Sequence, residues 1–202
     1  MSLQVDNAVG DVEELLDVLK GNTVEKAAYI SMLKQRKILL NDEINGSIIE
    51  AVVVPLMEFE KDASNEPVYF YINSNGGSAF DSFFITNIIE NYKKPLVIVN
   101  MGYALSAGFL LFIAGKNNPN VKRVCYNRSI GLLHAGNMAV DGNTDKVRDL
   151  VNFNDRLDEM TKNFVLNNSN LSAEDYEKHW REDWYFTAED MKKYGMVDEI
   201  LA

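Results

Sequence analysis

Apolar residues recur at two spacings along the chain, and these predict helices alternating with strands. Apolar positions three or four residues apart are typical of a helix with one buried face. Short runs rich in β-branched and aromatic residues are typical of strands. The predicted strands cover residues 37–40, 68–72, 96–100, 123–126, 129–133 and 196–200, with Tyr185-Phe186 as a further extended pair. The predicted helices cover residues 11–20, 22–33, 44–61, 80–89, 106–114, 144–167, 172–180 and 187–195.

This alternation favours an α/β fold with covered sheet faces. Residues 28–202 suit one domain of ordinary size, whereas residues 1–27 form a separable helical segment. Pro55 falls inside the predicted helix 44–61 and is expected to kink or break it, because proline lacks the N–H that bonds to the preceding turn.

A strand, a glycine-containing turn and a helix follow one another twice. The first unit spans residues 71–77 and the second spans residues 100–106. Both units are expected to deliver glycine and a helix N-terminus to the same edge of the sheet. This edge is where open α/β sheets gather their ligands.

Composition narrows the classes of function. The 202 residues carry a formal charge of -10, which repels phosphate backbones and argues against a nucleic-acid partner. Cys125 is the one cysteine and is expected to be a small buried hydrophobe, so no disulfide forms within the chain. No apolar run approaches the roughly 20 residues that span a bilayer, and the N-terminus lacks a secretory pattern. We therefore expect a cytoplasmic protein without membrane contact.

Ser106 is a candidate nucleophile because it lies where a strand ends and a helix begins, with Gly108 two residues later. A helix N-terminus offers unpaired N–H groups to a developing oxyanion. The alternative is that Ser106 merely caps its helix, as serine often does.

The other candidate residues are individually ambiguous. His134 directly follows a predicted strand and is either a general base or a structural histidine, whereas His179 lies in a charged sequence and is expected to be a solvated or packed helix residue. Asp183 closes a helical segment before an aromatic strand and could orient an imidazole. Gly76-Gly77 either brings a backbone N–H close to a ligand or forms a plain turn.

Taken together, these motifs resemble the Clp (caseinolytic) protease proteolytic subunit, a peptidase S14-like family. The resemblance covers residues 28–200 in the order of the family. It implies a Clp protease/crotonase-like α/β fold with repeated ββα units and a projecting handle helix at about residues 144–167. The motifs that carry the resemblance are Tyr71-Ile72-Asn73-Ser74-Asn75-Gly76-Gly77, residues 102–111 around Ser106, residues 130–134 ending in His134, residues 183–189 and residues 194–198.

The resemblance implies a serine endopeptidase in which Ser106 attacks, His134 transfers the proton and Asp183 holds the histidine in the useful tautomer. The substrates would be peptides or unfolded proteins, bound as an added strand. No cofactor and no metal are implied. The expected assembly is a homo-oligomer, a heptameric ring or double ring enclosing a chamber and fed by an ATP-dependent AAA+ unfoldase. The implied oxyanion donors are the backbone N–H groups of Gly76, Gly77 and Ala107.

Departures from the family pattern at Asn75, Leu105 and Arg181-Glu182 indicate a divergent member. Two alternatives from other classes remain open at this point. One is a catalytically inactive ring component of the same fold, and the other is a crotonase-type acyl-CoA enzyme with a similar glycine-built oxyanion hole.

Overall fold

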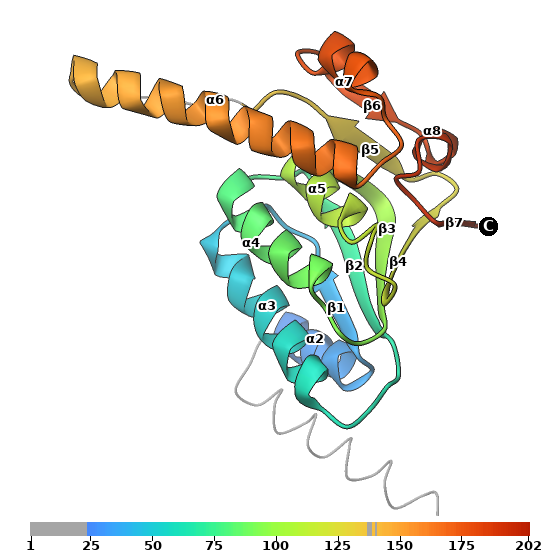
Figure 1. The fold of residues 1–202 in the computed structure, drawn as a ribbon. Coiled ribbons are helices and arrows are strands. Elements are labelled where there is room, and N and C mark those ends of the chain that lie inside the picture. The colour runs from blue at the N-terminus through green and yellow to red at the C-terminus, as the bar shows by residue number, and fades with distance from the viewer. Residues whose placement is uncertain (1–23, 137–138, 140) are drawn as a thin grey trace, which may run out of the picture.

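The computed structural model describes residues 24–136, 139 and 141–202, and the helix predicted at residues 11–20 lies outside them. A mixed α/β fold is confirmed, with helices packed on a largely parallel sheet (Figure 1). The helices are α2 Val24–Lys34, α3 Gly46–Lys61, α4 Ala79–Glu90, α5 Ala107–Ile113, α6 Thr144–Asn167, α7 Ala173–His179 and α8 Ala188–Lys193. The strands are β1 Lys37–Leu40, β2 Val68–Ser74, β3 Leu96–Leu105, β4 Val121–Tyr126, β5 Ile130–Leu133, β6 Trp184–Phe186 and β7 Glu199–Leu201.

Strand β3 organises the sheet. The order β1-β2-β3-β4-β7 is parallel throughout. The first half of β3 pairs with β4, and its last residues, Tyr103 to Leu105, pair with β5. Strand β6 then pairs antiparallel with β5. The strand predicted at residues 96–100 is therefore twice as long as expected, because its second half finds a different neighbour.

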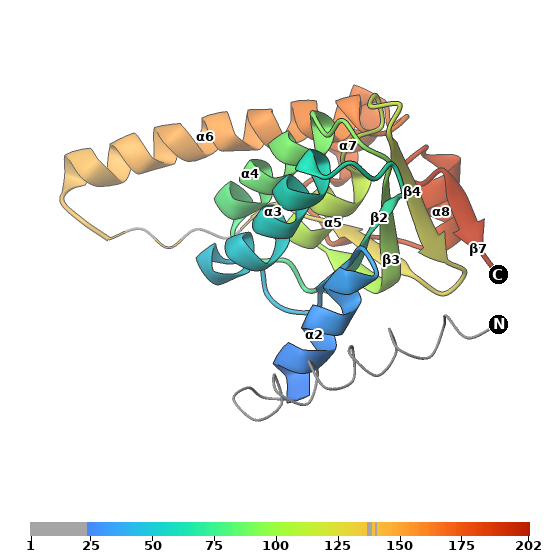
Figure 2. The same cartoon turned by 90° about the horizontal axis from the view of Figure 1, so that it is seen from below.

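The two faces of the sheet are not equally covered. Helices α3, α4 and α5 lie along one face, as Figure 2 shows, and β2 alternates strictly between buried and partly exposed residues. On the opposite face Tyr69, Tyr71 and Tyr126 line a shallow depression, and Tyr126 is 41% exposed. The expectation of covered sheet faces was therefore wrong for this face within the described residues.

Helix α3 continues through Pro55, so the chain is not broken there. Proline at this position leaves the carbonyl of Ala51, four residues earlier, without its helical N–H donor. The hydroxyl of Tyr29 in α2 donates a hydrogen bond to that carbonyl instead. The Ala51 carbonyl, which has no donor within α3, is therefore satisfied by a residue of α2.

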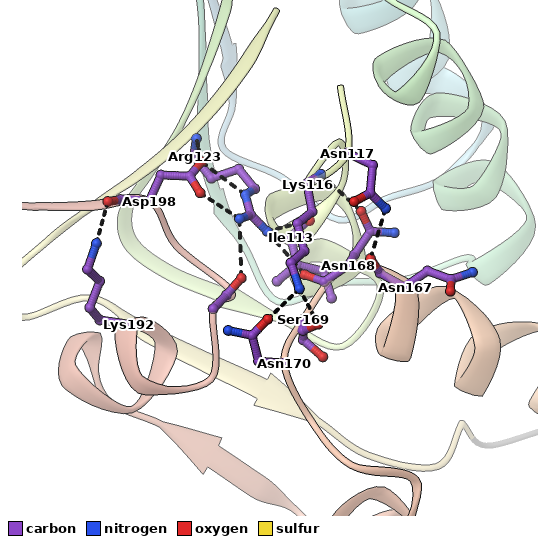
Figure 3. A network of polar contacts seen from close by, with 11 residues as sticks. Ile113, Lys116, Asn117, Arg123, Asn167, Asn168, Ser169, Asn170, Lys192 and Asp198 are labelled. Carbon is purple, nitrogen blue, oxygen red and sulfur yellow. Dashed lines mark hydrogen bonds and ion pairs between the residues drawn. The ribbon is translucent and has the colours of Figure 1, made fainter. Parts of the chain in front are cut away.

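A buried arginine joins the end of α6 to the sheet (Figure 3). The guanidinium of Arg123 in β4 donates hydrogen bonds to the carbonyls of Ile113, Asn168 and Gly195 and to the carboxylate of Asp198. Its side chain is 3% exposed. The C-cap of α6, the end of α5 and the segment before β7 are therefore fastened at one point.

Helix α6 extends beyond the body of the protein, as Figures 1 and 2 both show. Its bounds, Thr144–Asn167, are those predicted. Val165 near its end is buried, whereas Leu150, Val151 and Met160 are at least 42% exposed. Its role as a handle between rings stays a prediction.

Candidate active site

Ser106 lies in a strained turn between β3 and α5. Its φ of 55° and ψ of -123° are unusual for a residue with a side chain. Three backbone hydrogen bonds hold this conformation: the Ser106 N–H donates to Leu132 O at 2.9 Å, and its carbonyl accepts from Phe109 N at 2.9 Å and from Leu110 N at 3.2 Å. Within the described residues the Ser106 hydroxyl makes no capping hydrogen bond. The geometry presents the hydroxyl rather than using it as a helix cap.

Gly76 packs directly against this turn. A Cβ atom at Gly76 would lie 2.5 Å from Leu105 O and 2.9 Å from Ser106 Cβ, and the Gly76 φ of 97° already disfavours a side chain. The two strand-turn-helix units therefore meet at one edge of the sheet, as predicted. Only glycine allows this approach.

The backbone N–H groups at this edge are not equivalent. The Gly76 N–H donates to Ser74 Oγ at 3.1 Å, and that hydroxyl donates to Asp42 O at 2.6 Å. In the parallel bridge between Ile44 and Gly77, Ile44 bonds to the residues on either side of Gly77. The Gly77 N–H therefore faces away from Ile44 and donates to no partner among the described residues. Of the three predicted oxyanion donors, Gly76 is thus already engaged.

The third predicted oxyanion donor is the N–H of Ala107. It opens α5, and the first N–H groups of a helix have no partner within that helix. Gly77 and Ala107 therefore remain the candidate donors.

His134 and Asp183 come together through strand pairing. Leu133 of β5 pairs with Trp184 of β6, so the next residues outward, His134 and Asp183, face one another. His134 Nδ1 lies 3.1 Å from Asp183 Oδ1. The imidazole is the less accessible partner, with side-chain exposures of 26% for His134 and 61% for Asp183. An Nδ1–H donated to this carboxylate would leave Nε2 as the acceptor that a general base needs.

The second histidine belongs to a neighbouring cluster. The His179 ring packs 4.4 Å from the Trp184 ring, and its Nδ1 lies 3.2 Å from Glu182 Oε2. His179 is thus a packed surface residue.

Ser106 and His134 open into the same cleft, which has a volume of about 690 Å³. One wall comes from the glycine turn and the start of α4, including Gly77 and Phe80. Further lining residues come from α6, α7 and β6, including Leu157 and Trp184. Among the described residues, Ser106 and His134 make no direct hydrogen bond. The imidazole and the carboxylate are therefore paired, whereas the hydroxyl only shares their cleft.

The structure also bears on the cysteine, on membrane-spanning helices and on groups of metal-ligating side chains. Cys125 is fully buried, and burial raises the pKa of its thiol to about 11. Across the described ranges, no helix is long and apolar enough to cross a membrane. No group of three metal-ligating side chains occurs in the part of the chain that the structure describes.

The sequence motifs did not assign a role to every residue around the site. Ser74 lies inside the motif of residues 71–77, but its role in holding the Gly76 N–H was not predicted, because it looks like an ordinary buried strand residue. Asp158, Tyr176 and Trp180 line the cleft although none of them belongs to a motif, and Asp158 lies more than 20 residues from the nearest one. The only signal was the apolar stripe of α6, which gives no hint of a partner.

Comparisons with known proteins agree with the resemblance inferred from the motifs. A family model described as Clp protease matches residues 20–202. The chain is also 28% identical over 191 residues to the ATP-dependent Clp protease proteolytic subunit 3 of Synechococcus sp. (strain CC9605). That alignment covers 91% of this chain and 92% of the cyanobacterial protein.

Proposed function

The chain belongs to the Clp protease family, and from this premise we propose that it is a serine endopeptidase acting on peptides and unfolded proteins. Ser106 is the nucleophile, His134 the general base and Asp183 the residue that orients the imidazole. The observation that carries the proposal is the His134–Asp183 contact of 3.1 Å in the cleft into which Ser106 projects from a strained turn.

In the proposed mechanism, His134 Nε2 takes the proton of Ser106 Oγ while the oxygen attacks the peptide carbonyl. Asp183 stabilises the imidazolium that forms and stays ionised. The backbone N–H groups of Gly77 and Ala107 receive the developing oxyanion. His134 then protonates the leaving amine, and water hydrolyses the acyl-enzyme by the same proton route.

The missing Ser106–His134 hydrogen bond favours a second candidate, a catalytically inactive ring component. If the protein is an active peptidase, the Ser106–His134 hydrogen bond forms only when substrate or a neighbouring subunit orders the cleft. Catalytic hydrogen bonds are often long in free enzymes and shorten on binding. An inactive component would keep the two groups apart in every state.

The deciding experiment compares wild type with Ser106→Ala on fluorogenic peptides and on an unfolded protein. We expect turnover to be lost in the variant, by at least about a thousandfold, because a triad without its nucleophile keeps only residual catalysis. A fluorophosphonate should label wild type at Ser106 and leave the variant unlabelled. Absence of both labelling and turnover in folded wild-type protein would establish the inactive component instead.

We further propose that the chain forms a homo-oligomeric ring, heptameric as a single or double ring, with α6 as the handle between rings. The exposed Leu150, Val151 and Met160 support this, because a projecting helix gains from burying an apolar stripe. An AAA+ unfoldase would deliver substrates to the chamber. Mass measurement of the native particle, repeated on a Val151→Asp variant, tests the assembly: the variant should give smaller particles.

A further inference from the structure

The cleft beside Ser106 combines apolar walls with acidic side chains that no cation balances. Of the described residues that line it, Glu43 and Asp158 are acidic, and none is lysine or arginine. The formal charge of the whole chain, -10, has the same sign. A cleft lined by charge of one sign and by apolar walls attracts ligands of the opposite sign. The cleft therefore favours a cationic group on the substrate.

Asp158 is the acid placed to receive that group. It lies on α6 and accepts a hydrogen bond from Asn154 Nδ2 at 3.2 Å. Burial, and then the neighbouring Asp155, raise the pKa of the Asp158 carboxyl, the direction expected where no cation stands beside it. Within the described residues Asp158 makes no ion pair, because Lys162 on the same helix pairs with Glu177 at 2.5 Å.

Aromatic and aliphatic side chains complete the surroundings of this carboxylate. The rings of Tyr176 and Trp180 stack with centroids 6.1 Å apart and an angle of 20°, and both residues line the cleft together with Leu157. Asp158 and Tyr176 line the same cleft, and the pKa of Tyr176 is raised by burial first and by Asp158 next. Lysine and arginine lay their methylene stems along such apolar surface and place the cation on a ring face or a carboxylate.

Building on the proposed peptidase function, we propose that the cleft selects peptides with lysine or arginine beside the scissile bond. The carboxylate of Asp158 holds the cation, and Leu157 and Trp180 hold the stem. An apolar substrate side chain would fill the same walls but would leave the charge of Asp158 desolvated without a cation, which costs free energy. The basic side chain is therefore the better occupant.

The test uses fluorogenic peptides that differ at one residue, walked through the three positions on either side of the scissile bond. That residue is lysine, arginine, glutamate or norleucine, the last being a neutral chain of similar length. At one position, kcat/KM of wild type for lysine or arginine should exceed that for norleucine by about tenfold or more, as a charge-assisted contact in a partly dry site provides.

Asp158→Asn keeps the shape of the side chain and removes its charge. It should bring the ratio of kcat/KM for lysine to kcat/KM for norleucine to within about twofold. The matched control is Asp155→Asn on the same helix, an exposed carboxylate that does not line the cleft and should leave the ratio as in wild type. A wild-type preference for norleucine, or equal ratios in wild type and Asp158→Asn, would overturn the inference.

Binding separates this inference from the peptidase function. Ser106→Ala should bind the lysine peptide more tightly than the norleucine peptide in fluorescence anisotropy, and the added Asp158→Asn substitution should abolish that difference. Equal binding of the two peptides by Ser106→Ala overturns the inference. If Ser106→Ala binds the lysine peptide selectively but wild type shows no turnover, the inference about the cleft is supported and only the proposed peptidase activity is refuted.

Discussion

Replacing Arg123 with methionine should be among the most destabilising single changes in this protein. The guanidinium donates to the carbonyls of Ile113, Asn168 and Gly195 at 3.1–3.2 Å, and to both carboxylate oxygens of Asp198 (Figure 3). Methionine can fill the space of the stem but donates no hydrogen bond. Three carbonyls would then lose the donor that the buried guanidinium supplied, and the Asp198 carboxylate would keep only the backbone N–H of residue 123.

The size of the effect follows from the burial of the two partners. Arg123 is 3% exposed, whereas the side chain of Asp198 is 38% exposed and can recover part of its hydration. Breaking a buried pair by removing one partner costs about 3–5 kcal/mol in the free energy of unfolding. For a chain of this size that corresponds to a fall in Tm of roughly 6–20 °C.

Lys122→Met is the matched control. Lys122 is the neighbouring residue in β4 and also pairs with the segment of β7, through Glu199, but the two side chains are 53% and 48% exposed. Exposed pairs contribute less than about 1 kcal/mol. Urea unfolding followed by circular dichroism would compare the two variants. If Arg123→Met unfolds within about 1 kcal/mol of Lys122→Met, the reasoning about the buried network is refuted.

Repeating the urea unfolding at decreasing pH provides a second test of the Arg123–Asp198 contact. Burial alone would raise the pKa of Asp198, but hydrogen bonds from the side chain and backbone of Arg123 outweigh it and lower the pKa below its ordinary value of 3.8. A lowered pKa in the folded state stabilises the fold fully above the ordinary value, and this contribution is lost as pH falls through the folded one. The stability difference between wild type and Arg123→Met should therefore narrow below pH 3.8. A constant difference down to unfolding would contradict the assigned partner.

Three smaller predictions concern individual contacts. Tyr29→Phe removes the donor to the Ala51 carbonyl and should lower the free energy of unfolding by about 1 kcal/mol in urea titration, with no change expected if that carbonyl is hydrated instead. Gly131→Ala would place a Cβ atom 2.2 Å from a ring carbon of Phe109, and the resulting overpacking should lower stability by about 1–3 kcal/mol in a thermal melt. Cys125 should resist alkylation by iodoacetamide in the native protein and react fully in urea, because burial raises the pKa of its thiol to about 11; rapid native modification would show that it is accessible.

Much of the molecule could be read from local pattern. The α/β class and the full extent of α6 follow from residue spacing, because a buried helix face or strand imposes its own period on the chain. The candidates Ser106 and His134 were found in the same way, since each lies at the end of a strand where a turn must follow. The family resemblance then selected Asp183 from 30 acidic residues, a choice that spacing alone did not make.

The contacts between distant segments that assemble the site could not be predicted from local pattern. That His134 faces Asp183 depends on the antiparallel register of β5 and β6, and that Gly76 touches Ser106 depends on two neighbouring strands ending together. Neither register is encoded within a single segment, because each strand pair is chosen by competition among all possible partners in the folded chain. The continuation of α3 through Pro55 likewise involves a contact between distant segments, the hydrogen bond from Tyr29 to the Ala51 carbonyl.

The cleft opposite Ser106 shows this division most clearly. The stripe of α6 indicated that one side of the helix is apolar, but Asp158 interrupts that pattern only as one more acid in an acidic chain. Folding brings α6 beside α7 and turns Asp158 toward stacked aromatic rings without a cation. Residue type and spacing were thus sufficient for the elements and the reacting groups, whereas the surroundings of each charge arise from packing between distant segments.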